Sequence, residues 1–295
     1  MNHELRCYSA VLLAVALSCG GCSKGNDASN AESPAPASTA VTSPAPSSSP
    51  APLATSPVAT AASQTPPPGQ IASAGTFTDI AGINGEKEIA TLAQLGVVDP
   101  PSGTFDPGAP IKRREFIRWL VKANNVLWSD TPAKQLKLAD KTESSSFPDV
   151  SSADSDFPYI QGMQDAGYSV GFPDKTFRPD QALTREQMFA IKNVFDRGSV
   201  DPGLAKGIDY ARNTAMPPWK DKERISKTYV AAIATGAGGG NDSFGRVYGA
   251  SSVFRPQAPV TRAQAAVLVS VVGDHQFYGG APRTAAQKAL ASPTP

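Results

Sequence analysis

Cysteine and histidine are almost missing from this chain of 295 residues. All three cysteines lie within the first 22 residues, and the two histidines are His3 and His275. The rest of the chain therefore has no disulfide, no thiol nucleophile and no cysteine metal site. Carboxylates are numerous, but no spacing singles out an acid–base pair. We expect no enzyme activity, no cofactor and no bound metal.

An excess of charge of either sign is also missing. The chain has 27 Lys and Arg residues against 26 Asp and Glu residues, a formal net charge of +1. A nucleic-acid-binding domain usually carries a clear positive excess, so we expect no nucleic-acid partner. A local basic site remains compatible with this balance.

Long hydrophobic runs are missing except near the N-terminus. Arg6 precedes the apolar run Ala10–Leu17, whose eight residues are too few to span a bilayer as a helix. The length suits the core of a signal peptide. We predict a secreted, cell-envelope protein.

The residues after this run resemble a bacterial lipobox, in which a small residue precedes a cysteine that becomes lipid-modified. Ala16-Leu17-Ser18-Cys19 fits that pattern, and Gly20-Gly21-Cys22 fits it in its small residues. The resemblance implies a lipid on Cys19 or Cys22 and a membrane-anchored lipoprotein, at the cell surface or in the periplasm or outer membrane. An ordinary cleaved secretory peptide is the alternative. We assign residues 1–22 to this segment.

Residues 23–75 have few large apolar side chains and are rich in Pro, Ala, Ser and Thr. Such a composition cannot bury a core, so we predict a disordered linker with a polyproline II tendency. A linker of this kind suits a tether between a membrane anchor and a more distant target.

From Phe77 onward, three short motifs recur in the same order in three copies. The first is an aromatic residue, any residue and Asp; the second is Phe-x-Pro; the third is an apolar residue followed by a basic helix start. The first motif occurs at Phe77–Asp79, Phe147–Asp149 and Trp219–Asp221, the second at Phe105–Pro107, Phe177–Pro179 and Phe254–Pro256, and the third at Ile111–Glu115, Leu183–Gln187 and Val260–Gln264.

The residue pattern of each copy predicts two helices joined by a loop that is rich in turn residues. Glycine ends the first helix plausibly in every copy, at Gly96, Gly167 and Gly236. The second helix begins with a capping box at Thr184-x-x-Gln187 and at Thr261-x-x-Gln264. The first copy has Lys112 at the cap, where lysine cannot accept the bond, so we expect that helix start to fray.

We therefore predict an all-α fold of three helix-loop-helix repeats that share one core. We place repeat 1 at residues 76–128, repeat 2 at 146–198, repeat 3 at 218–280 and a disordered tail at 281–295. Residues 129–146 and 199–218 are predicted to be surface connections, the first with a short helix near residues 133–138. Gly236–Ser252 is predicted to be a flexible insertion.

The three motifs together resemble the S-layer homology repeat, and the clearest copy reads Gly171-Phe-Pro-Asp-Lys-Thr-Phe-Arg-Pro179 and Leu183-Thr-Arg-Glu-Gln187. The resemblance covers about two-thirds of the chain. It implies an all-helical pseudo-trimer that binds cell-wall polysaccharide without covalent attachment, often an acidic glycan that carries pyruvate ketals. A glycan-processing enzyme built on the repeats, and an adhesion protein whose repeats bind protein, are the alternatives.

The resemblance also implies a set of glycan-binding residues. The arginine of the third motif is associated with the acidic glycan, and the aspartate of the first motif lines the same grooves. A tryptophan that the family often has after this aspartate is missing, and Phe157 stands nearest to its position in repeat 2. The implied residues are Arg113, Arg185, Arg262, Asp79, Asp149, Asp221 and Phe157.

The arginines also support an anion site on physical grounds. Each lies at the first helical position, where a cation faces the positive end of the helix dipole. An anion held by the arginine and by free N–H groups of the helix start would explain the repetition. The structural alternative is a salt bridge to a repeat aspartate, such as Asp149 to Arg185. The aspartates themselves are predicted either to cap helices or to contact the glycan.

Overall fold

A computed structural model of the protein describes residues 77–99, 103–168, 171–237, 243–273, 286 and 289–290. The predicted signal peptide, Cys19, Cys22, the linker and most of the C-terminal tail lie outside these residues. The described part is helical and contains no strand, which confirms the predicted all-α class. Within it, no helix is both long enough and apolar enough to cross a membrane.

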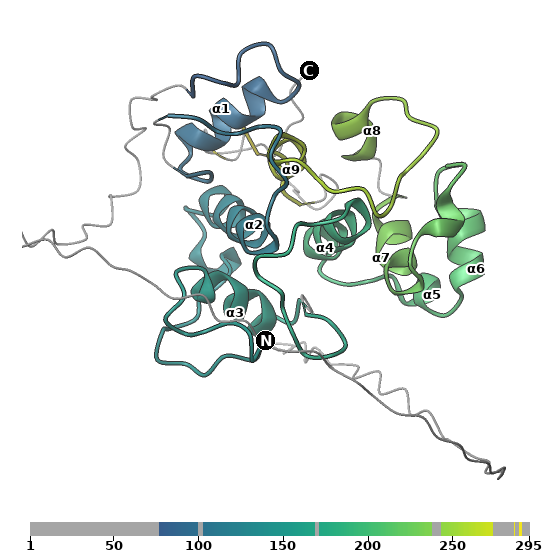
Figure 1. Ribbon diagram of the computed structural model, residues 1–295. Helices are drawn as coiled ribbons and strands as arrows, with labels where there is room; N and C mark the ends of the chain where they lie inside the picture. The colour runs from purple at the N-terminus through teal and green to yellow at the C-terminus, as the bar shows by residue number, and fades with distance from the viewer. Residues whose placement is uncertain are drawn as a thin grey trace, which may run out of the picture. The chain divides into compact units, whose positions relative to one another are not determined.

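Each repeat contains two principal helices (Figure 1). They are α1 (Glu86–Gln94) and α2 (Arg113–Leu127) in repeat 1, α3 (Phe157–Asp165) and α4 (Arg185–Arg197) in repeat 2, and α7 (Lys227–Ala237) and α9 (Arg262–Val269) in repeat 3. Shorter segments join them: η1 (Pro132–Lys134), α5 (Pro202–Ala205), α6 (Ile208–Tyr210), the π-helical turn η2 (Ala211–Ala215), η3 (Lys222–Arg224) and α8 (Ser243–Tyr248).

The apolar residue of the third motif ties the three repeats into a ring of main-chain hydrogen bonds. The Leu183 N–H donates to the Ile111 carbonyl (3.1 Å), the Val260 N–H to the Leu183 carbonyl (2.9 Å), and the Ile111 N–H to the Val260 carbonyl (2.9 Å). All three side chains are fully buried. Because buried main-chain groups need partners, this closed ring satisfies them without a sheet.

The helices follow the same cyclic order. The second helix of each repeat packs against the first helix of the next repeat: α2 against α3, α4 against α7, and α9 against α1. In Figure 1, α2, α4 and α9 form the inner helices of the folded part. This arrangement confirms the predicted pseudo-trimer.

The first two motifs recur because their aromatic residues pair inside each repeat. The ring centroids are 5.2 Å apart for Phe77 and Phe105, 5.5 Å for Phe147 and Phe177, and 4.6 Å for Trp219 and Phe254. All six residues are buried. Such pairs contribute about 0.5–1.5 kcal/mol beyond the burial of their apolar surface.

Two of the three predicted glycine stops are confirmed. Gly96 (φ 68°) and Gly167 (φ 84°) adopt the left-handed conformation just after α1 and α3. Gly236 instead lies inside α7, so that prediction is wrong. A Cβ there would lie 2.0 Å from the side chain of Asn193, so this glycine allows α4 and α7 to approach closely.

Sequence reasoning underestimated the order of two segments. Residues 199–218, predicted to be a surface connection, contain α5, α6 and η2. The second half of Gly236–Ser252, predicted to be a flexible insertion, forms α8. Phe244 of α8 packs against Trp219 with ring centroids 4.8 Å apart, which gives this segment its own place on the core.

Candidate functional site

The aspartate of the first motif is hydrogen-bonded to the Phe-x-Pro turn of its own repeat. The two oxygens of Asp79 accept from the N–H groups of Phe105 (2.8 Å) and Asp106 (2.7 Å). Asp149 does the same with Phe177 (2.9 Å) and Arg178 (2.7 Å), and Asp221 with Phe254 and Arg255 (2.7 Å each). The same two-bond contact therefore occurs in all three repeats.

The conformation of the turn explains why a carboxylate is needed there. Asp106, Arg178 and Arg255 have φ values of 55°, 59° and 54°, an uncommon left-handed conformation for residues other than glycine. In this conformation two successive N–H groups converge and form a small anion-binding nest. The bond from Phe105 is the leading cause that lowers the pKa of Asp79.

Of the two roles expected for these aspartates, helix capping or glycan contact, their side chains do not perform the first. Asp221 immediately precedes η3, but its carboxylate binds the turn and makes no capping bond. Helix α1 begins at Glu86 and α3 at Phe157, seven and eight residues after Asp79 and Asp149. The carboxylates are directed to the turn because its nest has two N–H donors that need an acceptor.

Main-chain bonds also join each second helix to the following repeat. The N–H of Arg113 donates to the Gln181 carbonyl (2.9 Å), that of Arg185 to Ala258 (3.0 Å), and that of Arg262 to Ala109 (2.9 Å). The N–H groups of the next residues, Arg114, Glu186 and Ala263, donate to the carbonyls of Pro179, Pro256 and Pro107, respectively. The N–H groups that we expected to be free for an anion are thus occupied. These carbonyls also secure the start of α2, where Lys112 provides no side-chain cap.

We call the contact between each second helix and the following repeat a seam, giving seam 1–2, seam 2–3 and seam 3–1. One arginine of the third motif lies in each seam, and each reaches an aromatic residue of the following repeat. The Arg113 guanidinium carbon lies 4.6 Å from the Phe172 ring centre, that of Arg185 lies 3.8 Å from Tyr248, and that of Arg262 lies 4.7 Å from Phe105.

The three arginines differ in burial. Arg113 is only 4% exposed, and burial lowers its pKa to about 10, so it keeps its charge at neutral pH. The Phe172 ring contacts Arg178 as well as Arg113. The guanidinium carbon of Arg178 lies 4.0 Å from the centre of this ring. Arg185 and Arg262 are half-buried.

The three arginines also differ in their polar partners. Arg185 donates to the Phe254 carbonyl (3.1 Å), and its buried Nε atom has no hydrogen-bond partner among the residues that the structure describes. Arg262 donates through Nε to the Phe105 carbonyl (2.7 Å) and through Nη1 to the carboxylate of Glu115. Among described residues, no ion pair joins Arg185 to Asp149, the salt bridge that we considered from sequence.

Phe157, the expected stacking surface for a sugar, occupies a different environment. It is the first residue of α3 and is fully buried, so no face of its ring is exposed to a ligand. Aromatic residues that sequence reasoning missed lie beside the arginines instead. Phe172 could have been found within the Gly-Phe-Pro-Asp motif, whereas Tyr248 lies in the insertion and has no counterpart in the motif.

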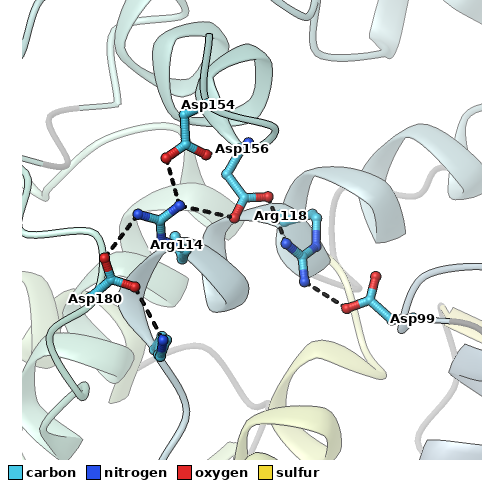
Figure 2. A network of polar contacts seen from close by, with 7 residues as sticks. Asp99, Arg114, Arg118, Asp154, Asp156 and Asp180 are labelled. Carbon is cyan, nitrogen blue, oxygen red and sulfur yellow. Dashed lines mark hydrogen bonds and ion pairs between the residues drawn. The ribbon is translucent and has the colours of Figure 1, made fainter. Parts of the chain in front are cut away.

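A network of ion pairs crosses seam 1–2 (Figure 2). Arg114 contacts Asp154 (2.6 Å) and Asp180 (3.0 Å), and Arg118 contacts Asp156 (2.6 Å) and Asp99 (2.6 Å). Lys112 also contacts Asp180 (3.1 Å). Each cation has a carboxylate partner, so this network holds two repeats together. In the described part, no group of three or more His, Cys, Asp or Glu side chains could hold a metal ion.

Comparison with known families reproduces the three copies. The family model of the S-layer homology domain matches residues 76–117, 146–189 and 218–266. Each matched stretch begins just before an aromatic-x-Asp motif and ends inside a second helix. It therefore contains both the aspartate and the Phe-x-Pro turn to which the aspartate is hydrogen-bonded. No curated protein sequence matches the chain.

Proposed function

We propose that the chain binds an acidic cell-wall polysaccharide at seam 2–3, because three of its stretches match the S-layer homology domain, a cell-surface and cell-wall binding module. The proposed attachment is non-covalent and involves no catalysis. The glycan is proposed to carry carboxylates, such as those of pyruvate ketals. An N-terminal lipid on Cys19 or Cys22 would hold the other end of the chain in a membrane.

The observation that carries the proposal is the state of Arg185. Arg185 is half-buried, its guanidinium packs against Tyr248, and it forms no ion pair with a carboxylate of the described residues. The only hydrogen bond that it makes there is to the Phe254 carbonyl. A guanidinium has five N–H donors in a planar fork that matches a carboxylate. Arg185 therefore retains the capacity to bind an external acidic group.

The test is co-sedimentation of the full chain, with Cys19 and Cys22 changed to serine, with cell walls. We expect binding to native walls and loss of binding to walls stripped of acidic polysaccharide. Equal binding to both kinds of wall would contradict the proposal. Binding to a wall protein rather than to glycan would favour the adhesion alternative.

Arg185→Ala should weaken wall binding about 10- to 150-fold, because a charge-assisted contact contributes about 1.5–3 kcal/mol. Arg185→Lys should recover only part of the affinity, because an ammonium group lacks the planar fork. Arg113→Ala should have a smaller effect, since Arg113 is almost fully buried. Lys141→Ala removes an exposed cation between repeats and is the matched control.

Helicity of each variant is checked by circular dichroism, so that unfolding is not mistaken for a lost contact. A folded Arg185→Ala variant that binds like the parent would rule out seam 2–3 as the principal site.

The proposed lipid anchor is tested separately by mass spectrometry of the mature N-terminus. We expect an acylated Cys19, or else an acylated Cys22. A mature chain that begins at an unmodified residue would remove the anchor and leave the glycan-binding proposal unchanged.

A further inference from the structure

The third residue of each second helix differs in charge between repeat 1 and the other two repeats. This position holds Glu115 in α2, Gln187 in α4 and Gln264 in α9. A glutamate and a glutamine have the same length and shape, but only glutamate carries a negative charge at neutral pH. The difference therefore places one carboxylate at one of three equivalent positions.

The two glutamines are engaged in their own helix starts. The Thr184 N–H donates to Gln187 Oε1 (3.4 Å) and the Thr261 N–H to Gln264 Oε1 (3.2 Å). The backbone of each glutamine donates in return to the threonine hydroxyl. Both capping boxes predicted from the sequence are thereby confirmed.

Glu115 belongs to the one second helix that has no capping box, and Lys112 stands at its cap position. The Lys112 side chain cannot accept a hydrogen bond, and its ammonium group contacts Asp180 instead. The Glu115 carboxylate crosses seam 3–1 and accepts from Nη1 of Arg262. The side chain at the third position of α2 is thus paired with an arginine of another repeat, whereas Gln187 and Gln264 bond to their own helix starts.

The surroundings of Arg262 add more negative charge. Burial lowers the pKa of Arg262, and the charges of Asp99, Asp106 and Asp79 oppose this effect. Its Nε is held by the Phe105 carbonyl (2.7 Å). Arg185 has the neutral Gln264 where Arg262 has Glu115, and the amide oxygen of Gln264 accepts from the hydroxyl of Tyr248 (3.4 Å).

We infer that Glu115 is an internal counter-ion that occupies the arginine of seam 3–1 and excludes acidic ligands from it. The Glu115 carboxylate takes the place that a ligand carboxylate would take on Arg262. The three repeats therefore present unequal sites, and Glu115 is the residue that determines the difference. This inference rests on the proposed function, in which the same arginine position binds an acidic glycan.

The decisive experiment uses the full chain, with Cys19 and Cys22 changed to serine, and acidic polysaccharide released from cell walls as the probe. Glu115→Gln is introduced into the parent and into the Arg185→Ala variant. In the Arg185→Ala background, we expect Glu115→Gln to raise the affinity for the acidic probe about tenfold. Adding Arg262→Ala to that double variant should abolish the gain, because the gain comes through Arg262.

The control is Glu143→Gln, which changes the net charge by the same amount in the segment between repeats 1 and 2. It should restore nothing, which separates a local effect from weaker general repulsion of an anionic probe. Neutral polysaccharide from the same walls should bind all variants equally.

A second variant tests the same inference without removing Glu115 or Arg262. Lys112→Thr gives α2 a hydroxyl that can accept from the N–H of residue 115, which favours the capping-box geometry in which the Glu115 carboxylate bonds to the N–H of residue 112, as Gln187 bonds to Thr184 in α4. This variant should also raise the affinity of the Arg185→Ala chain for the acidic probe. It stays informative if Glu115→Gln proves unstable.

The possible outcomes separate the inference from the proposed function. If the parent binds and Arg185→Ala weakens binding, but neither Glu115→Gln nor Lys112→Thr restores it, then Glu115 does not exclude acidic ligands from Arg262. If the parent fails to bind and Glu115→Gln binds, the role of Glu115 holds and the assignment of Arg185 is overturned. If no variant binds the acidic probe, both are overturned.

Discussion

Seam 1–2 and seam 2–3 join their repeats through the same main-chain hydrogen bonds but through different side-chain chemistry. At the second position of the second helix, seam 1–2 has Arg114, which contacts Asp154 and Asp180 of repeat 2. Seam 2–3 has Glu186, which accepts from the N–H (2.9 Å) and hydroxyl (2.8 Å) of Ser226 just before α7. The charge at this position is reversed, yet the repeats keep the same cyclic arrangement.

The comparison shows which contacts define the fold and which vary within it. The ring at Ile111, Leu183 and Val260 and the carboxylate-filled turns are present in every repeat. The side chains around them differ from seam to seam. Seam 1–2 should therefore respond to charge and salt, and seam 2–3 should respond to the loss of the hydrogen bonds between Ser226 and Glu186.

The largest effect should come from Asp156→Ala, which breaks seam 1–2 at its most buried carboxylate. The Asp156 side chain is 3% exposed and contacts Arg118 at 2.6 Å. Removing one partner of a buried pair costs about 3–5 kcal/mol, and the remaining contact of Arg118 with Asp99 reduces this to about 2–3 kcal/mol. Urea unfolding of the full chain measures the loss.

The matched control for this variant is Asp209→Ala, which removes an exposed aspartate of α6. An equal loss of stability in the two variants would mean that the ion network does not hold the seam.

A smaller effect is expected for Glu186→Ala in seam 2–3. The variant removes the acceptor for two groups of Ser226 at the start of α7, a loss of about 1–2 kcal/mol. Glu186→Gln keeps one acceptor oxygen and should lose about half as much. The unfolding of the Glu186→Gln and Asp156→Ala variants is then repeated at high salt. The unfolding free energy of the neutral Glu186→Gln variant should change less than that of Asp156→Ala. A larger loss for Glu186→Gln than for Glu186→Ala would contradict this role.

The smallest effect is expected for Asp180→Asn at the exposed edge of seam 1–2. The hydrogen bond from Lys112 is the leading cause that lowers the pKa of Asp180. A carboxylate with a lowered folded-state pKa stabilises the fold above its unfolded pKa of about 3.9, and this contribution is lost as the pH falls through the folded value. The side chain is 63% exposed, so screening limits the contribution to about 0.5 kcal/mol.

The parent and the Asp180→Asn variant should therefore differ slightly at neutral pH and low salt, and should converge in acid or at high salt. The difference in unfolding free energy across pH 2–7 measures this. A difference that grows toward acid would reverse the assigned sign.

Repetition made the fold predictable from sequence, and the lack of repetition limited the prediction of the site. The capping boxes at Thr184 and Thr261 depend on nearby residues, so their spacing is visible in the sequence. The contact of Glu115 with Arg262 joins residues far apart in the chain, and no local pattern indicates it. The insertion that carries Tyr248 has no counterpart in the other repeats, so its helix and its contact with Arg185 could not be inferred by comparison.

The ring of main-chain hydrogen bonds has a mechanical consequence for a chain pulled from one end. Repeat 1 is bonded to repeat 2 through the Ile111 carbonyl and to repeat 3 through the Ile111 N–H. In an open array of repeats, tension at a terminus can peel units away one after another, because each touches only its neighbours. Here a load that enters through repeat 1 is divided between two seams, and that repeat detaches only when both give way together.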